Sequence, residues 1–335
     1  MSVHSPLPDI YLSFFMFTTD MKPTDLDYRK TVVTHIKKLQ EFGYSGFEFP
    51  IAPTFNQSFA QDVSNYQALR DYLDGQGLDK VKIATNVGAT RTYDPTSSYP
   101  AQQQQALKYL KSRVDITAAL RGEILMGPIV LPYGVFPTTD FNEPIWSDRL
   151  QDLLVKRYHQ AQPILNELGE YAITKKVKLA IEPITHWETP GPNKLSQLMT
   201  FLEGVSSHQV GVVIDSAHET LDGDGSTTFQ TQVAQLATQN RLHYIQVSPP
   251  DRGALHTSWL PWQDFLKPVL KVYKGPIAIE IFNAIPAFVN SLRLSRRKFW
   301  IPEEDTPNSY PSAYDIAESA IKKTQEELRK IINPT

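Results

Sequence analysis

The chain has 335 residues, of which 41% are hydrophobic, and a formal net charge of −3. One large core can be buried at this length, and the charge provides no broad basic surface for a nucleic-acid backbone. The absence of cysteine excludes disulfides, thiol nucleophiles, Cys-ligated zinc and iron–sulfur clusters. No signal-peptide pattern opens the chain, and no stretch approaches the ~18 apolar residues of a membrane helix. We therefore expect a soluble, cytoplasmic protein.

Short apolar runs alternate along the chain with longer amphipathic segments. Eight runs are predicted to be strands, namely 10–19, 45–50, 81–90, 124–136, 177–184, 210–218, 242–250 and 276–283. Between them, apolar residues recur three and four positions apart in helix-like segments such as 28–43, 101–122 and 149–176. Eight such alternations predict a (β/α)8 barrel. A doubly wound sheet is the alternative, but the sequence has no GxGxxG or P-loop motif.

The barrel is expected to cover about residues 9–283, and a C-terminal extension residues 284–335. Together they make the whole chain, 1–335, a single domain. The extension ends in a predicted helix that begins near Ser312, a residue type that caps helix N-termini. An arginine-rich stretch at 290–300 either binds a substrate phosphate or carboxylate or forms an exposed face or subunit contact, and both readings stay open.

Polar residues end four consecutive strands, five to eight: Glu182, Asp215, Gln246 and Glu280. Active sites of (β/α)8 barrels lie at this end of the strands. Three carboxylates converging there would repel one another unless a cation neutralised them. Carboxylate and amide oxygens suit Mn²⁺ or Mg²⁺ better than zinc or copper. These four residues are therefore the predicted metal ligands.

Three further residues follow the same strands and are candidates for substrate binding. Glu188 lies six residues after Glu182, His218 three residues after Asp215, and Arg252 just beyond strand seven. Each also has a plain structural reading, as a solvated carboxylate, a histidine bonded to backbone or a surface arginine. In the same way, Phe15 and Phe17 either wall a sugar site or pack in the core.

The motifs "EPITHWE", "DSAH" and "DRG" at these positions resemble those of the xylose isomerase-like TIM barrels, which include the D-tagatose 3-epimerase and hydroxypyruvate isomerase families. The resemblance spans nearly the whole chain and implies a divalent metal held by strands five to eight, with Co²⁺ a further candidate beside Mn²⁺ and Mg²⁺. Two departures stand out. Thr185 and His186 replace the Asn-Arg pair of the ketose epimerases, and Gln246 stands where those enzymes have histidine. Hydroxypyruvate isomerases and some dehydroshikimate dehydratases are similar in using glutamine there.

This resemblance implies a metal-dependent isomerase or epimerase of a small ketose or keto-sugar. Glu182 and Glu280 would be the catalytic pair, one removing a proton beside a carbonyl and the other returning it, while the metal holds the enediolate. Return to the same carbon is epimerisation, delivery to the neighbouring carbon is isomerisation, and the sequence leaves both open. The expected partner is a small sugar or keto acid, with no nucleic acid and no membrane, in a monomer or a homodimer.

Three other functions use related barrels. A 3-dehydroshikimate dehydratase-like lyase would use the same metal to stabilise an enolate, and a non-catalytic sugar-binding barrel would need only the cavity. Endonuclease IV requires a histidine-rich zinc site, and of the 8 histidines only His218 lies beside the proposed ligands. DNA repair is therefore disfavoured.

Overall fold

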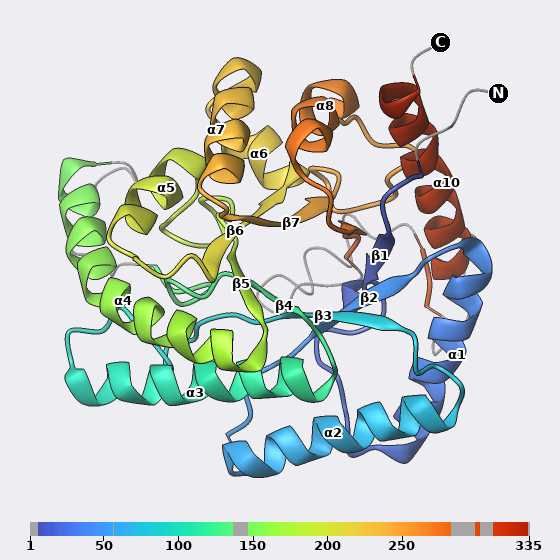
Figure 1. The fold of residues 1–335 in the computed structure, drawn as a ribbon, viewed down its shortest axis with the longest axis horizontal. Helices are drawn as coiled ribbons and strands as arrows, with labels where there is room; N and C mark the ends of the chain where they lie inside the picture. The colour runs from blue at the N-terminus through green and yellow to red at the C-terminus, as the bar shows by residue number, and fades with distance from the viewer. Residues whose placement is uncertain (1–5, 56, 137–146, 283–298, 302–310, 334–335) are drawn as a thin grey trace.

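The computed structural model describes residues 6–55, 57–136, 147–282, 299–301 and 311–333. Eight parallel strands close into a barrel in sequence order, with β8 pairing back onto β1 (Figure 1). The strands are β1 (Ile10–Ser13), β2 (Gly46–Pro50), β3 (Lys82–Asn86), β4 (Ile124–Gly127), β5 (Lys178–Ile181), β6 (Val210–Asp215), β7 (Leu242–Val247) and β8 (Ile277–Ile279). The predicted (β/α)8 fold is confirmed.

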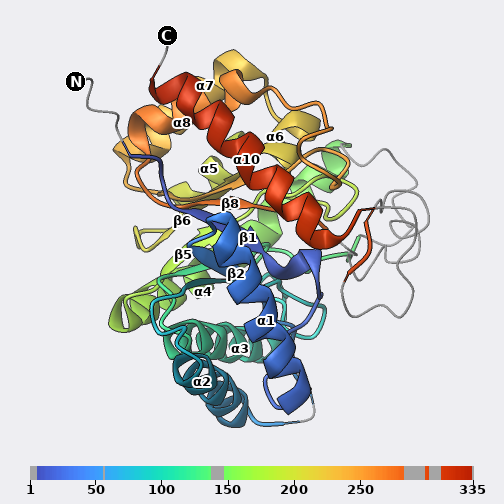
Figure 2. The same ribbon diagram turned by 90° about the vertical axis from the view of Figure 1, so that its right-hand side faces the viewer.

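Helices surround this barrel in Figure 1. They are α1 (Leu26–Phe42), α2 (Phe59–Gly75), α3 (Pro100–Ala119), α4 (Asp148–Lys175), α5 (Leu195–Glu203), α6 (Ser216–Asp222), α7 (Ser226–Thr238), α8 (Trp262–Val272) and α10 (Ala313–Ile332). Figure 2 shows α10 running between α1 and α8, both of which it contacts. Its predicted cap is confirmed, because the Ser312 hydroxyl accepts from Asp315 N and Asp315 accepts from Ser312 N.

Every strand is shorter than the run predicted for it, and two of them end early for clear local reasons. The run at 10–19 leaves the sheet after Ser13, whose hydroxyl accepts from Phe15 N at the start of a short 3₁₀ helix, η1 (Phe14–Met16). The run at 124–136 ends at Gly127, which has φ 128° and whose added Cβ would lie 2.3 Å from Val87 O. The rest of that run forms a loop over the barrel mouth.

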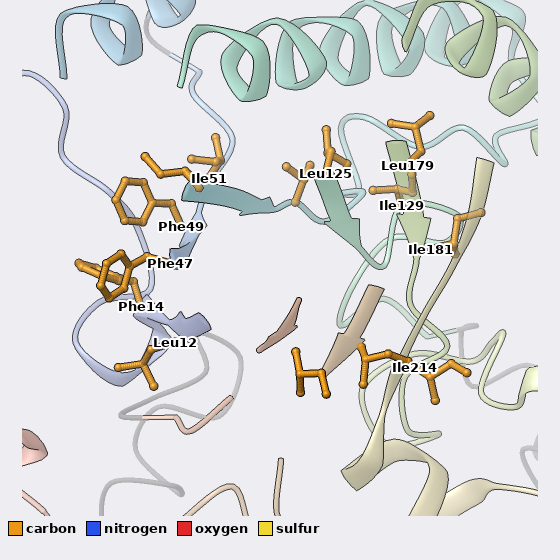
Figure 3. Close-up of a cluster of buried hydrophobic side chains, with 14 of the residues drawn as sticks. Leu12, Phe14, Phe47, Phe49, Ile51, Leu125, Ile129, Leu179, Ile181 and Ile214 are labelled. Atoms are coloured by element: carbon orange, nitrogen blue, oxygen red, sulfur yellow. The ribbon is translucent and has the colours of Figure 1, made fainter. Parts of the chain in front are cut away.

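The period-two alternation of the strands divides their side chains into two sets. One set belongs to the large core outside the barrel, and Figure 3 labels Leu12, Phe47, Phe49, Leu125, Leu179, Ile181 and Ile214 among its members. The other set forms a separate apolar cluster, which consists of Tyr11, Ala84, Met126, Ala180, Val213, Tyr244 and Ala278. Because these positions alternate with the outward ones, this second cluster fills the barrel interior.

The proposed division into a barrel at 9–283 and an extension at 284–335 stays a prediction, because residues 283–298 and 302–310 lie outside the described part of the chain. The arginines of the 290–300 stretch fall in this part. Among the described helices, none combines the length and apolar character needed to cross a membrane.

A buried ion pair joins α2, α3 and one wall of the barrel mouth. Arg113 Nη2 pairs with Asp62 Oδ2, and neither side chain is more than 3% exposed. Asp62 also accepts from Thr54 Oγ1 and Gln57 Nε2, at 2.8 and 2.9 Å. Arg113 Nη1 donates to Ala52 O at 3.1 Å. The pair therefore fixes the loop after β2, which borders the mouth.

We expect Arg113→Met to lower the free energy of unfolding by about 3–5 kcal/mol, because it leaves Asp62 as a buried charge without its cation. Urea unfolding at pH 7 measures the loss. Arg113→Met combined with Asp62→Asn is the matched control, and it should recover part of the loss. If the double variant lost as much as the two single variants added together, uncompensated charge would not be the cause.

Candidate functional site

Each predicted metal ligand lies two residues after a member of the apolar cluster in the barrel interior, which we call the apolar floor. It is therefore the next inward-pointing residue along its strand. Glu182 follows Ala180 on β5 in this way, and the same step leads from Val213 to Asp215, from Tyr244 to Gln246 and from Ala278 to Glu280. All four are buried, with exposures of 5%, 1%, 0% and 2% in that order. Adjacent parallel strands therefore bring these side chains to one rim of the barrel.

Arg252 lies among these carboxylates. Its Nη1 donates to Asp215 Oδ2 at 2.5 Å and to Glu280 Oε2 at 3.3 Å, and also to the Ser248 hydroxyl at 2.7 Å. Its Nη2 lies 3.7 Å from Glu188 Oε1. The residue has φ 56° and a side chain that is 3% exposed. The structure thus shows Arg252 as a buried cation within the acidic cluster and not as a surface residue.

His218 also points into the cluster. Its Nε2 lies 3.3 Å from Glu182 Oε1 and 3.7 Å from Asp215 Oδ2. Thr185 N donates to its Nδ1 at 3.1 Å, and Arg252 Nη2 lies 2.8 Å from its Nε2, so both ring nitrogens face hydrogen-bond donors. Burial, followed by the nearby Arg252 charge, holds the pKa of His218 well below its usual range. Burial therefore favours the neutral imidazole.

Glu188 is buried as well, at 4% exposure. Its carboxylate accepts from Thr185 Oγ1 at 3.0 Å, and its backbone carbonyl accepts from Gly134 N at 2.9 Å in the loop after β4. Burial raises the pKa of Glu188. Thr185, which replaces the asparagine of the ketose epimerases, thus positions both Glu188 and His218. His186, the other replacement, pairs with Asp222 nearer the surface.

One residue of the cluster was missed by sequence reasoning. Glu48 on β2 is 0% exposed, and its carboxylate accepts from Ser13 Oγ at 3.0 Å, from Asn86 Nδ2 at 3.4 Å and from Gln246 Nε2 at 3.0 Å. The available signal was its place between Phe47 and Phe49, because a charged residue flanked by outward apolar residues must point into the barrel.

The carboxyl groups of this cluster strongly disfavour their charged forms. Burial, followed by repulsion from Asp215, raises the pKa of Glu182 well above its usual range, and burial followed by repulsion from Glu182 does the same for Glu280. Burial raises the pKa of Asp215 although Arg252 opposes the shift, and it raises that of Glu48 to about 7. One guanidinium does not balance so many buried carboxylates.

The residues present fit a divalent cation. Glu182, Asp215 and His218 each offer a ligand atom, and these atoms lie within 4.8 Å of one another. Gln246 Oε1 is buried without a hydrogen-bond partner among the described residues, as expected of an amide oxygen reserved for a ligand. His218, predicted to contact substrate, therefore joins a group that also suits a metal.

A cavity of about 350 Å³ opens above the cluster. Glu182, Glu188, His218, Arg252 and Glu280 line its polar side. The other lining residues are mainly apolar and include Phe15, Pro50, Ile51, Pro53, Val135, Ile184 and Phe282. Asp215 and Gln246 are not among the lining residues, and both are almost fully buried.

The two aromatic residues whose role was left open separate in the structure. Phe15 lines the cavity, with its ring centroid 4.9 Å from that of Phe282. Phe17 instead stacks on His35 at 4.0 Å and belongs to the helix-facing core. Phe15 is thus a wall of the cavity, whereas Phe17 is a packing residue.

We expect Arg252→Leu to destabilise the metal-free protein by about 3–5 kcal/mol at pH 8, because it removes the buried cation from among the carboxylates. A carboxyl group whose folded pKa exceeds its unfolded value stabilises the fold while protonated, and this contribution disappears as pH rises through the folded pKa. The loss should therefore shrink at pH 5.5. Urea unfolding in EDTA at both pH values measures it, and an equal loss at both would contradict this explanation.

Comparison with known proteins agrees with the geometry. Residues 36–298 match the family model of the xylose isomerase-like TIM barrel. A crystal structure from Anabaena variabilis ATCC 29413, provisionally assigned as a sugar phosphate isomerase/epimerase, is 74% identical, with a TM-score of 0.94 over 97% of this chain and 100% of that one.

Two more distant relatives are named as epimerases. The L-ribulose 3-epimerase of Methylomonas sp. (strain DH-1) is 24% identical over 231 residues, covering 67% of this chain and 73% of the relative. The structure of D-allulose 3-epimerase from Methylomonas sp. with D-allulose is 19% identical, with a TM-score of 0.72 over 97% of this chain and 98% of that one, and it shows a shared fold. The chain belongs to the xylose isomerase-like TIM barrel family.

Proposed function

We propose that this protein is a divalent-metal-dependent epimerase of a small ketose. The observation that carries the proposal is the buried acidic cluster at the floor of the cavity, beside which Gln246 Oε1 has no hydrogen-bond partner in the part of the chain that the structure describes. The metal would be held by Glu182, Asp215, Gln246 and Glu280, with His218 able to join them. Oxygen ligands dominate this set, which favours Mn²⁺ or Mg²⁺ and admits Co²⁺.

Glu182 and Glu280 are proposed to move the proton. They follow β5 and β8, which are separated by β6 and β7, and both line the cavity. A substrate between them would meet one carboxyl group on each face, so that the ionised one removes the proton beside the carbonyl and the other, which begins protonated, delivers its own proton from the opposite face. A bound divalent ion supplies a Lewis acid that stabilises negative charge on the substrate oxygens.

The remaining lining residues would orient the substrate. Glu188 would accept from sugar hydroxyls, Arg252 would donate to substrate oxygens, and His218 would contact the same end of the substrate. The rings of Phe15 and Phe282 offer an apolar face to the C–H side of a sugar and exclude water from the reacting carbon. A volume of about 350 Å³ lies at the small end of ligand cavities and suits a single monosaccharide.

Epimerisation is favoured over isomerisation by the names of the relatives. The relatives from Methylomonas sp. and Arthrobacter globiformis are called L-ribulose 3-epimerase and ketose 3-epimerase. In a 2-ketose, the carbon at position 3 is next to the carbonyl, so its proton is acidic enough to be exchanged between two glutamates. Delivery of a proton from the second glutamate to the opposite face of the same carbon needs no further catalytic group.

The test is deuterium wash-in. The Mn²⁺-loaded protein is incubated in D₂O with free and phosphorylated ketoses, hydroxypyruvate and 3-dehydroshikimate, and nuclear magnetic resonance locates the exchanged carbon. We expect deuterium at carbon 3 of a ketose. Glu280→Gln should slow this exchange by about 10²-fold or more, as is typical for loss of a general acid or base.

Glu123→Gln is the matched control for this measurement, because it makes the same chemical change at an exposed position before β4, at the opposite end of the barrel. It should exchange at the wild-type rate. Wash-in by Glu280→Gln at a rate near wild type would contradict the two-glutamate mechanism. Loss of water from dehydroshikimate without exchange into any ketose would instead identify a dehydratase.

A second measurement concerns metal choice. An imidazole binds Co²⁺ and Zn²⁺ more tightly than an amide oxygen does, whereas the amide favours harder ions. Gln246→His should therefore tighten Co²⁺ and Zn²⁺ binding relative to Mg²⁺, as measured by calorimetric titration of the metal-free protein. Gln235→His, at an exposed position of α7, controls for histidine added elsewhere. An unchanged preference in Gln246→His would show that residue 246 is not a ligand.

A further inference from the structure

Glu48 is a buried carboxylate that the proposed proton transfer does not use. It lies on β2, it is 0% exposed, and its hydrogen-bond partners among the described residues, Ser13, Asn86 and Gln246, are all uncharged. Within the described part of the chain it forms no ion pair. Burying a carboxylate without a cation is costly, so its position calls for a role.

The contact with Gln246 spans the barrel interior, because β2 and β7 are separated by β1 and β8 in the closed sheet. Gln246 Nε2 lies 3.2 and 3.0 Å from the two oxygens of Glu48 and 3.1 Å from Glu280 Oε1. A carboxylate accepts hydrogen bonds and cannot donate them. In their charged forms the two glutamates therefore require the amide nitrogen to face them and the amide oxygen to face away from them.

That oxygen is the atom that has no partner among the described residues. If Glu48 were replaced by a side chain that both donates and accepts, either end of the Gln246 amide could face it. The carboxylate at position 48 thus removes one of the two amide orientations, and the orientation that remains leaves the oxygen free for a cation.

We infer that Glu48 is a positioning residue that holds the Gln246 amide with its oxygen turned toward the divalent cation. The inference rests on the proposed function, since it requires a metal at this site. Ser13 and Asn86 hold Glu48 in turn from the strands on either side of β2, at 3.0 and 3.4 Å. Residues of β1 and β3 thus hold Glu48, and Glu48 in turn holds Gln246 on β7.

The experiment compares Mn²⁺ affinity in metal-free wild type, Glu48→Gln, Gln246→Leu and the double variant, with free Mn²⁺ counted by electron paramagnetic resonance. Glu48→Gln preserves the side-chain volume but allows either amide orientation. We expect it to weaken Mn²⁺ binding by about 10–100-fold, the range for groups that orient metal ligands. In the Gln246→Leu background the same change should have a much smaller effect, because no amide remains to be oriented.

Equal losses in both backgrounds would overturn the inference, because Glu48 would then act only through its charge or through folding. Wild-type affinity in Glu48→Gln would overturn it as well. If wild type itself bound no Mn²⁺, the proposed function would fail and the inference with it. Intact wild-type binding without coupling between Glu48 and Gln246 would remove only the positioning role.

Two further variants complete the test. Ser13→Ala removes one donor to Glu48, and it replaces Glu48→Gln if the latter does not fold. It should weaken Mn²⁺ binding less, in the same direction, and again only when Gln246 is present. Thr85→Val is the matched control, because its buried hydroxyl pairs with Thr117 Oγ1 at 2.6 Å on the other face of β3. It should retain wild-type Mn²⁺ affinity.

Discussion

The alternation of side chains along strands that close into a barrel is the constraint on which the site depends. Every second residue points into an interior that has no room for bulk water, so the polar layer above the apolar floor must satisfy its own hydrogen bonds. Glu48 shows how this is done, since its carboxylate connects β2 with Ser13 on β1 and with Gln246 on β7. The strands that build the barrel and the strands that carry the site are the same elements.

The second consequence of this arrangement is that several acidic groups are buried close together. Several carboxylates share one buried region, and Arg252 is the cation that the described residues place directly between Asp215 and Glu280. Its guanidinium lowers the cost of burying these groups without removing it, which is why burial and mutual repulsion still raise the pKa values of Glu182 and Glu280. A cluster in which carboxyl groups outnumber cations is suited to attract a divalent ion and to surround a substrate with groups that exchange protons.

Much of this could be predicted from the sequence, because the signals are local. Apolar runs of strand length predict the barrel, and an acidic or amide residue at the end of each of four runs identifies Glu182, Asp215, Gln246 and Glu280. Glu48 was missed because it lies within its strand and not after it. The proximity of His218 to Glu182 could not be predicted either, because it depends on the direction in which a side chain leaves α6. The spacing of residues in the sequence does not reveal that direction.

The lengths of the strands were overestimated where apolar residues continue past the sheet. Composition cannot distinguish a strand from an apolar loop that packs over it, and the decisive features were a serine hydroxyl at Ser13 and a backbone torsion at Gly127. The same limit applied to the aromatic residues near β1. Phe15 and Phe17 are two positions apart and chemically identical, yet η1 turns one toward the cavity and the other toward His35.

The apolar floor lies directly beneath the site and supports it by close packing. Tyr11 takes up the space that Gly46 leaves free, since a Cβ on that glycine would lie 2.4 Å from the tyrosine ring. Ala180 and Ala278 each stand two residues before a proposed catalytic glutamate. Those glutamates therefore stand on a closely packed layer of side chains that never meet a substrate. In such a packed interior, a change in the volume of one floor residue shifts its neighbours, so a substitution there can move the glutamates while every residue of the rim stays the same.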